Sequence, residues 1–142
     1  MKMINKYEIV LQYIKDLSLE ISNAKSFLYS REHITKYVLG IDITTDTLKN
    51  DMVEVITKLT HKDPNDKIKN SYFEISYSTV IKIKDKNIKK PDLEKLLLCD
   101  LQKEVYPKIE KIFINLMKDA GFPELKLDKK VDFDQLYQQR LN

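Results

Sequence analysis

The chain of 142 residues is poor in glycine and cysteine and contains no tryptophan. Its only glycines are Gly40 and Gly121. Glycine-rich phosphate loops need several positions without a Cβ, so this count excludes a P-loop and a dinucleotide-binding turn, and we expect no cofactor. The single cysteine, Cys99, cannot form a disulfide within the chain, which is typical of a reducing compartment. No apolar run approaches the roughly 20 residues of a membrane-spanning helix, so we expect a soluble, cytoplasmic protein without membrane insertion.

Neither basic nor acidic residues are in large excess. There are 25 Lys and Arg residues against 22 Asp and Glu residues, which gives a formal net charge of +3. Only Arg31 and Arg140 are arginines, and lysine is poorer at bidentate recognition of bases or phosphates, so we expect no nucleic-acid partner. A basic run from Lys82 to Lys90 is interpreted either as a solvated loop or as a patch for an acidic partner, and the sequence leaves both open.

The first two-thirds of the chain has the period-two pattern of β-strands. Tyr7, Ile9, Leu11 and Tyr13 alternate with polar or smaller positions, and the pattern continues to Ile21. Further strands are predicted over about residues 37–43, 52–59 and 71–83. A turn signal over residues 61–66 and other short polar connections favour antiparallel hairpins over crossovers.

The last third has the apolar spacing of helices. Pro91 suits the first turn of one helix, and Pro107 is expected to break or kink it near Tyr106. A second amphipathic segment ends at Gly121, and a capping box formed by Asp132 and Gln135 starts a short C-terminal helix. We predict a single α+β domain over residues 1–142, in which a four-stranded antiparallel sheet (about residues 7–83) is followed by helices (about 91–141) packed on one face.

Candidate catalytic and metal-binding groups are sparse. His33 and His61 lie far apart, and neither has metal-ligand spacing with Cys99, so a structural or exposed role is favoured for both histidines. A nucleophile elbow cannot be written around the two glycines. We therefore expect neither an enzyme nor a metal site.

Polar residues recur on alternate positions of two predicted strands. The first strand carries Asp16, Ser18 and Glu20, and the fourth carries Tyr72 and Glu74. Side chains at alternate positions share a face, so each strand presents an acid-bearing stripe. The solvent-facing side of a half-buried sheet is the ordinary explanation of such a stripe, and the pattern alone does not favour a binding site over it.

Two stretches at opposite ends of the chain carry a resemblance to a known family. Residues 12–20 (QYIKDLSLE), followed by Asn23 and Ala24, resemble the opening strand of the protein-export chaperone SecB. Residues 119–123 (DAGFP) and 131–137 (VDFDQLY) resemble the end of that family, and Tyr106-Pro107 falls where the family has an aromatic-Pro pair. The resemblance spans about residues 7–141.

The resemblance implies an ATP-independent chaperone that binds unfolded preproteins and delivers them to the translocation motor SecA. It implies a homotetramer built as a dimer of dimers. It assigns SecA contact to Asp16, Glu20, Tyr72 and Glu74. It assigns a stripe that supports subunit assembly to Phe73, Ile75 and Tyr77. It places an apolar client groove between the sheet and the segment joining the helices, for which we expect Tyr106 and Phe122.

An alternative of another class remains open. The same fold and groove would also serve a dedicated interaction module that holds one partner, such as an unstable antitoxin. The clients that co-purify with the chain distinguish the two hypotheses, because a mixed set of exported proteins favours the export chaperone and one protein favours the module.

Overall fold

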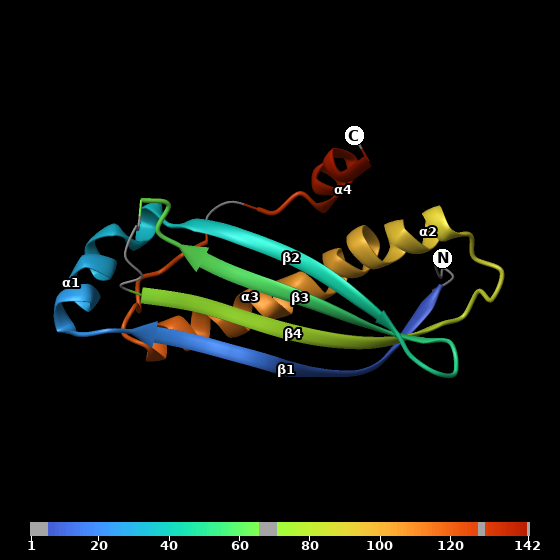
Figure 1. Cartoon of the computed structure of the whole chain (residues 1–142), viewed down its shortest axis with the longest axis horizontal. Helices are drawn as coiled ribbons and strands as arrows, with labels where there is room; N and C mark the ends of the chain where they lie inside the picture. Colours follow the sequence, from blue (N-terminus) through green and yellow to red (C-terminus); the bar gives the residue numbers. More distant parts are fainter. Residues whose placement is uncertain (1–5, 66–70, 128–129, 142) are drawn as a thin grey trace.

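One antiparallel sheet forms one layer of the protein. The computed structural model describes residues 6–65, 71–127 and 130–141. Its strands are β1 (Tyr7–Ile21), β2 (Val38–Thr47), β3 (Met52–Lys62) and β4 (Ser71–Ile83), in the order β1-β4-β3-β2 (Figure 1). The predicted α+β fold, a four-stranded antiparallel sheet followed by helices, is confirmed.

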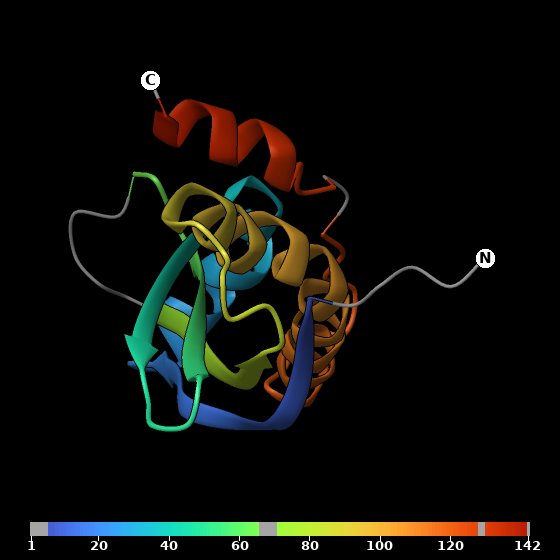
Figure 2. The same ribbon diagram turned by 90° about the vertical axis from the view of Figure 1, so that its right-hand side faces the viewer.

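Helices form the second layer and extend beyond the ends of the sheet. The chain forms α1 (Ala24–His33), the 3-10 turn η1 (Ile34–Lys36), α2 (Lys90–Lys95), the π-helical turn η2 (Leu96–Asp100), α3 (Leu101–Asp119) and α4 (Phe133–Leu141). The two views show α3 running along one face of the sheet, with α1 at one end and α2 at the other (Figures 1 and 2). The helical layer leaves the opposite face of the sheet uncovered.

The core lies between the sheet and α3. Odd-numbered residues of β4 point toward the helix, and Phe73, Ile75 and Ile81 are fully buried. Ile109 and Phe113 of α3 belong to the same buried cluster. Fully burying such a side chain contributes roughly 1.5–3 kcal/mol, so this cluster holds α3 on the sheet. The even-numbered positions of β4 form the uncovered outer face of the sheet.

Two register shifts in β1 change which residues reach that outer face. The pairing passes from Ile9↔Ile81 to Leu11↔Val80, so Val10 is an extra residue and the alternation reverses after it. Leu11 and Tyr13 therefore lie on the outer face, and the prediction that they share a face with Tyr7 and Ile9 is wrong. A second shift between Ile14 and Asp16 restores the original alternation.

α1 is unexpected, because the sequence pattern predicts no element between the first strand, which continues to Ile21, and the strand over about residues 37–43. Asn23 caps the helix, because its side-chain oxygen accepts a hydrogen bond of 2.8 Å from the backbone N–H of Ser26. Ser26 and Ser30 are buried on this helix. The inner side of α1 contains these serines and is only weakly apolar. Hydrophobic periodicity therefore does not predict a helix here.

Of the break or kink expected near Tyr106 and Pro107, the break is wrong. α3 continues through Pro107, and the irregular turn lies earlier, at η2. Proline removes the N–H that would bond to the carbonyl of Lys103, but both residues are exposed, so that carbonyl is accessible to solvent and the helix tolerates the loss. The N-cap half of the predicted capping box is present, since Asp132 accepts a 3.0 Å hydrogen bond from the backbone N–H of Gln135.

β3 extends to Lys62 and not only to the predicted Leu59. His61 is therefore a strand residue with 4% of its surface exposed, although the sequence placed it in a turn signal. The turn begins at Asp63, whose carboxylate accepts a hydrogen bond of 3.0 Å from the N–H of Asn65. The last residue of the predicted turn, Asp66, lies outside the described residues.

Candidate functional site

The outer face of the sheet contains an acidic hollow of about 330 Å³ between the ends of β1 and β4. It is lined by Asp16, Ser18, Glu20, Ser22, Ser71, Tyr72 and Glu74. The cross-strand pairs Ser18↔Glu74 and Glu20↔Tyr72 bring the two stripes together. The structure thus gathers all four residues to which the resemblance assigns partner contact.

Glu74 is the most enclosed carboxylate of the acidic hollow, with 8% of the residue exposed. The Nζ atom of Lys58 on β3 lies 3.0 Å from its Oε1, and the hydroxyl of Tyr72 donates to the same oxygen. Burial raises the pKa of Glu74, but these hydrogen bonds and the Lys58 charge outweigh it and the net shift is downward. The bond to Glu74 raises the pKa of Tyr72 to about 12. The negative charge of Glu74 is therefore compensated within the chain, whereas Asp16 and Glu20 are exposed.

A second carboxylate cluster lies further along the outer face. Glu54 on β3 accepts hydrogen bonds from Tyr13 and, at 2.7 Å, from Ser78, and Lys15 Nζ lies 3.5 Å from its other oxygen. The bond from Tyr13 is the main reason why the pKa of Glu54 is below its ordinary value. Tyr13 reaches Glu54 only because the shift at Val10 turns it outward, so the bulge assembles this cluster.

The residues expected at a subunit interface are buried within one chain. Phe73 and Ile75 are fully buried, and Tyr77 is 4% exposed and lies beneath α3 with Lys108 Nζ 5.8 Å from its ring centroid. These side chains point away from the outer face. Their role in assembly stays a prediction, and it would have to act through the packing of the sheet on α3.

The two aromatic residues expected in a client groove are core residues. Tyr106 is 5% exposed and its ring packs 5.3 Å from that of Phe133. Phe122 is 2% exposed and contacts Phe27 and Phe73, with ring centroids 5.3 and 5.4 Å away. Neither is among the residues that line the hollow described next, so a client groove at these two side chains stays a prediction.

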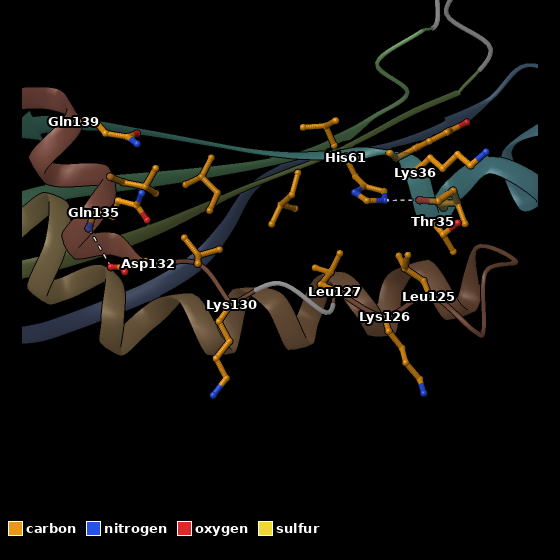
Figure 3. Close-up of a pocket in the computed structure, with 17 residues that line it drawn as sticks. Thr35, Lys36, His61, Leu125, Lys126, Leu127, Lys130, Asp132, Gln135 and Gln139 are labelled. Atoms are coloured by element: carbon orange, nitrogen blue, oxygen red, sulfur yellow. Dashed lines mark hydrogen bonds between the residues drawn. The ribbon is translucent and has the colours of Figure 1, made fainter.

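A larger apolar hollow of about 770 Å³ lies beside β2, at the edge of the sheet. One wall comes from η1 and β2, and the other from residues 125–127 and 130–132 and from α4 (Figure 3). Its apolar lining includes Leu39, Ile41, Leu125, Leu127, Val131 and Leu136. No sequence pattern predicts this apolar hollow, because much of its second wall is a connection without regular secondary structure.

Contacts between helices fix α4 as one end of the apolar hollow. The carboxylate of Asp134 lies 2.8 Å from Lys103 Nζ and accepts a 3.1 Å hydrogen bond from the thiol of Cys99. The bond to Lys103 is the main reason why the pKa of Asp134 is low. Burial raises the pKa of Cys99 to about 11, so this thiol stays protonated and acts as a donor. Cys99 is thus a structural residue.

The basic run from Lys82 to Lys90 stays open to both interpretations, a solvated loop or a patch for an acidic partner. The lysines between Lys82 and Lys90 are all exposed, and Lys86 lies 3.9 Å from Asp51. Within residues 6–65, 71–127 and 130–141, no group of three or more His, Cys, Asp or Glu side chains could hold a metal ion. In the same part of the chain, no helix is long and apolar enough to cross a membrane.

The sequence matches a known family over nearly its whole length. The family model "Preprotein translocase subunit SecB" matches residues 2–142. The chain is 40% identical over 140 residues to "Putative protein-export protein SecB" of Pelagibacter ubique, covering 99% of this chain and 100% of that protein. It is 32% identical to the protein-export protein SecB of Rhodopseudomonas palustris, covering 94% of this chain and 79% of that protein.

A solved structure has the same fold. It is a Mycobacterium tuberculosis SecB-like chaperone in complex with a ChAD peptide from the HigA1 antitoxin, and it aligns with a TM-score of 0.66 over 88% of this chain and 91% of that one. At 11% identity this likeness shows the fold alone. The matched relatives are chaperones, which agrees with the prediction that the chain is not an enzyme. The chain belongs to the SecB family of protein-export chaperones.

Proposed function

We propose that the protein binds unfolded preproteins in the cytoplasm without ATP, keeps them competent for export and delivers them to SecA. Membership of the SecB family supports this role, and two separate surfaces of the chain fit its two steps. The apolar hollow would hold the client, and the acidic hollow would contact SecA.

The apolar hollow is the observation that carries the proposal. It combines aliphatic side chains with the open edge of β2, whose Val38, Leu39 and Ile41 form part of its wall. A strand at the edge of a sheet has unpaired N–H and C=O groups, so an extended segment gains main-chain hydrogen bonds as well as apolar contacts. Such a surface accepts segments of many sequences, as an export chaperone requires.

The acidic hollow fits a basic partner. Asp16 and Glu20 are exposed on the uncovered face of the sheet, where Tyr72 is the cross-strand partner of Glu20 and Glu74 is that of Ser18. Opposite charges across an interface mainly raise the association rate and select the partner. The overall charge of +3 makes this local cluster more important, because the rest of the chain repels a basic surface.

A homotetramer fits the uncovered edge of β1. This edge strand exposes five apolar side chains by 41–49%: Val10, Leu11, Tyr13, Ile14 and Leu17. Long apolar edge strands favour pairing with another strand, so we propose that two copies associate along β1 and that two such dimers form the tetramer.

A dedicated interaction module is the second candidate. The solved structure that shares the fold is a SecB-like chaperone in complex with an antitoxin peptide, and that partner is a single protein. For this chain, the alternative predicts the same occupied apolar hollow but no contact between the acidic hollow and SecA.

The decisive experiment measures the refolding of a slow-folding preprotein with one tetramer of the purified protein per client. We expect refolding to be delayed and to resume when SecA is added. Normal refolding in its presence would contradict the chaperone proposal. A delay for one co-purifying partner and not for preproteins would favour the dedicated module.

A further inference from the structure

His61 is the buried polar group in the wall of the apolar hollow. It lies near the end of β3, is 4% exposed and faces the hollow beside η1 (Figure 3). Its ring packs 5.6 Å from the ring of Tyr37 and 6.2 Å from that of Phe113. An aliphatic or aromatic side chain would fill this space without burying a polar atom. A buried imidazole at this position therefore needs a physical reason.

One nitrogen of the ring has a partner and the other has none among the described residues. Nε2 lies 3.3 Å from the carbonyl oxygen of Ile34. A carbonyl only accepts hydrogen bonds, so Nε2 carries the proton and the neutral ring presents the lone pair of Nδ1 as an acceptor. Nδ1 is out of contact with solvent and makes no hydrogen bond within the described chain. Buried polar atoms are rarely left in this state.

The position of Nδ1 indicates what could satisfy it. Nε2 points to the backbone of η1, and Nδ1 lies on the other side of the ring, toward the space between β2 and the connection that holds Leu127 (Figure 3). The lysines of that connection, Lys126 and Lys130, point away from this space (Figure 3). These two lysines therefore do not supply the donor, and a ligand lying in the apolar hollow can.

An extended polypeptide supplies such donors at regular intervals. Leu39 of β2 is the cross-strand partner of His61 and lines the same hollow, so a segment lying along β2 passes close to the ring. Because Nδ1 is out of contact with solvent, the hollow would have to open around the ring for the segment to reach it. Every client residue except proline carries a main-chain N–H group. One of these groups would then reach the acceptor Nδ1.

We propose that Nδ1 of His61 accepts a hydrogen bond from a main-chain N–H of the polypeptide segment held in the apolar hollow. The inference rests on the proposed chaperone function and adds a specificity to it. The hollow recognises backbone donors at one fixed point, so a client segment with proline or an N-methylated residue there binds less well.

Two substitutions separate the two ring nitrogens. His61→Gln keeps a donor near the position of Nε2, where it can bond to Ile34, and removes the acceptor at Nδ1. His61→Asn keeps an amide oxygen near the position of Nδ1 and gives up the bond to Ile34. If His61 is purely structural, His61→Gln should bind the client better than His61→Asn. If Nδ1 recognises the client, His61→Asn should bind the client better than His61→Gln.

The experiment measures the binding of a fluorescein-labelled, 20-residue peptide rich in Leu, Tyr and Ser by anisotropy at pH 7.5. We expect on the order of tenfold weaker binding to His61→Gln than to the wild type, and near wild-type binding to His61→Asn. A set of peptides, each N-methylated at one position, should contain one that binds the wild type about tenfold more weakly and does not weaken further with His61→Gln.

The outcomes distinguish the two levels of the proposal. Equal binding of the peptide to the wild type and His61→Gln, with refolding still delayed by both, overturns the role of Nδ1 and leaves the chaperone function intact. Weaker binding to Asn than to Gln also overturns it. A wild-type protein that neither binds the peptide nor delays refolding overturns both. Circular dichroism and light scattering verify that each variant keeps the fold and assembly of the wild type.

Discussion

Lys58 Nζ lies 3.0 Å from Glu74 Oε1 and joins β3 to β4 at the border of the acidic hollow. Glu74 raises the pKa of Lys58, and the charges of Asp42 and Asp16 add to this effect. Lys58 is therefore the internal counter-ion of the acidic residues that we propose for SecA contact. A basic partner that approaches Glu74 meets this ammonium group first.

Replacing Lys58 by glutamine is expected to strengthen SecA binding by a few fold, because the substitution frees Glu74 and removes a repulsive charge. Lys15→Gln is the matched control. Lys15 also pairs with a glutamate on the outer face, and the two lysine side chains are both 43% exposed. Both variants change the net charge equally, so calorimetric titration with SecA isolates the local effect. Equal SecA affinities of the two variants would contradict the proposed role of Lys58 as the counter-ion of the acidic hollow.

Charge reversal at Glu20 tests the acidic hollow itself. Glu20 is exposed in the hollow, so Glu20→Lys should weaken SecA binding by on the order of tenfold and leave assembly unchanged. Glu8→Lys makes the same change on the same strand and the same face, near the opposite end of β1. If both substitutions weaken binding alike, the effect is long-range and the assigned contact is rejected.

The sequence predicted the sheet well because its signal is local. β4 occupies the predicted residues 71–83, and the positions of Asp16, Glu20, Tyr72 and Glu74 followed from alternation and the resemblance. Alternation alone failed at Val10, because an extra residue in a bulge leaves no distinct trace in an apolar strand. The outward position of Tyr13, and with it the cluster around Glu54, therefore required the structure.

The apolar hollow was harder to locate for a different reason. Its walls come from β2, η1 and the connection before α4, which meet only in the folded chain. Aromatic residues such as Tyr106 and Phe122 attract attention in a sequence, yet they lie in the core. Burial depends on where α3 packs, and no local pattern distinguishes a core aromatic residue from one in a groove.

Leu136 tests the apolar hollow as the client site. It lies on α4, lines the hollow and is 44% exposed, so Leu136→Glu should preserve the fold. A charge in an apolar contact surface should reduce the delay of preprotein refolding and weaken client binding by on the order of tenfold. Leu48→Glu is the control, since Leu48 is exposed by 37% in the turn between β2 and β3, outside the hollow. Equal loss in both variants would place the client elsewhere.

The burial of His61 predicts a pH dependence of stability. Desolvation lowers its pKa below the ordinary value of 6.5. The rings of Tyr37 and Phe113 and the carbonyl of Ile34 contact it, and Lys36, Lys126, Lys130 and Asp132 line the same hollow. Between the two pKa values the unfolded chain binds a proton that the folded chain does not. The stabilisation from this site is therefore complete above about pH 6.5 and decreases as the pH falls below it.

Urea unfolding between pH 7.5 and 5 measures this dependence. The decrease should disappear in His61→Gln and persist in His33→Gln, which removes the other histidine of the chain. A separate decrease below about pH 4.5 should remain in all three proteins, because Glu54 and Glu74 have lowered pKa values in the fold. A decrease near pH 6 that survives in His61→Gln would assign it to another group.

Assembly along β1 is tested by the solution mass. Ile14 lies on this edge strand and is 44% exposed, so Ile14→Glu would place a charge in the proposed strand pairing. We expect light scattering to give a mass near four times 16.8 kDa for the wild type and a smaller assembly for this variant. Leu48→Glu, at the far side of the sheet, should retain the wild-type mass. A tetramer that persists with Ile14→Glu would exclude the β1 edge as the contact, and a wild-type monomer would exclude the assembly itself.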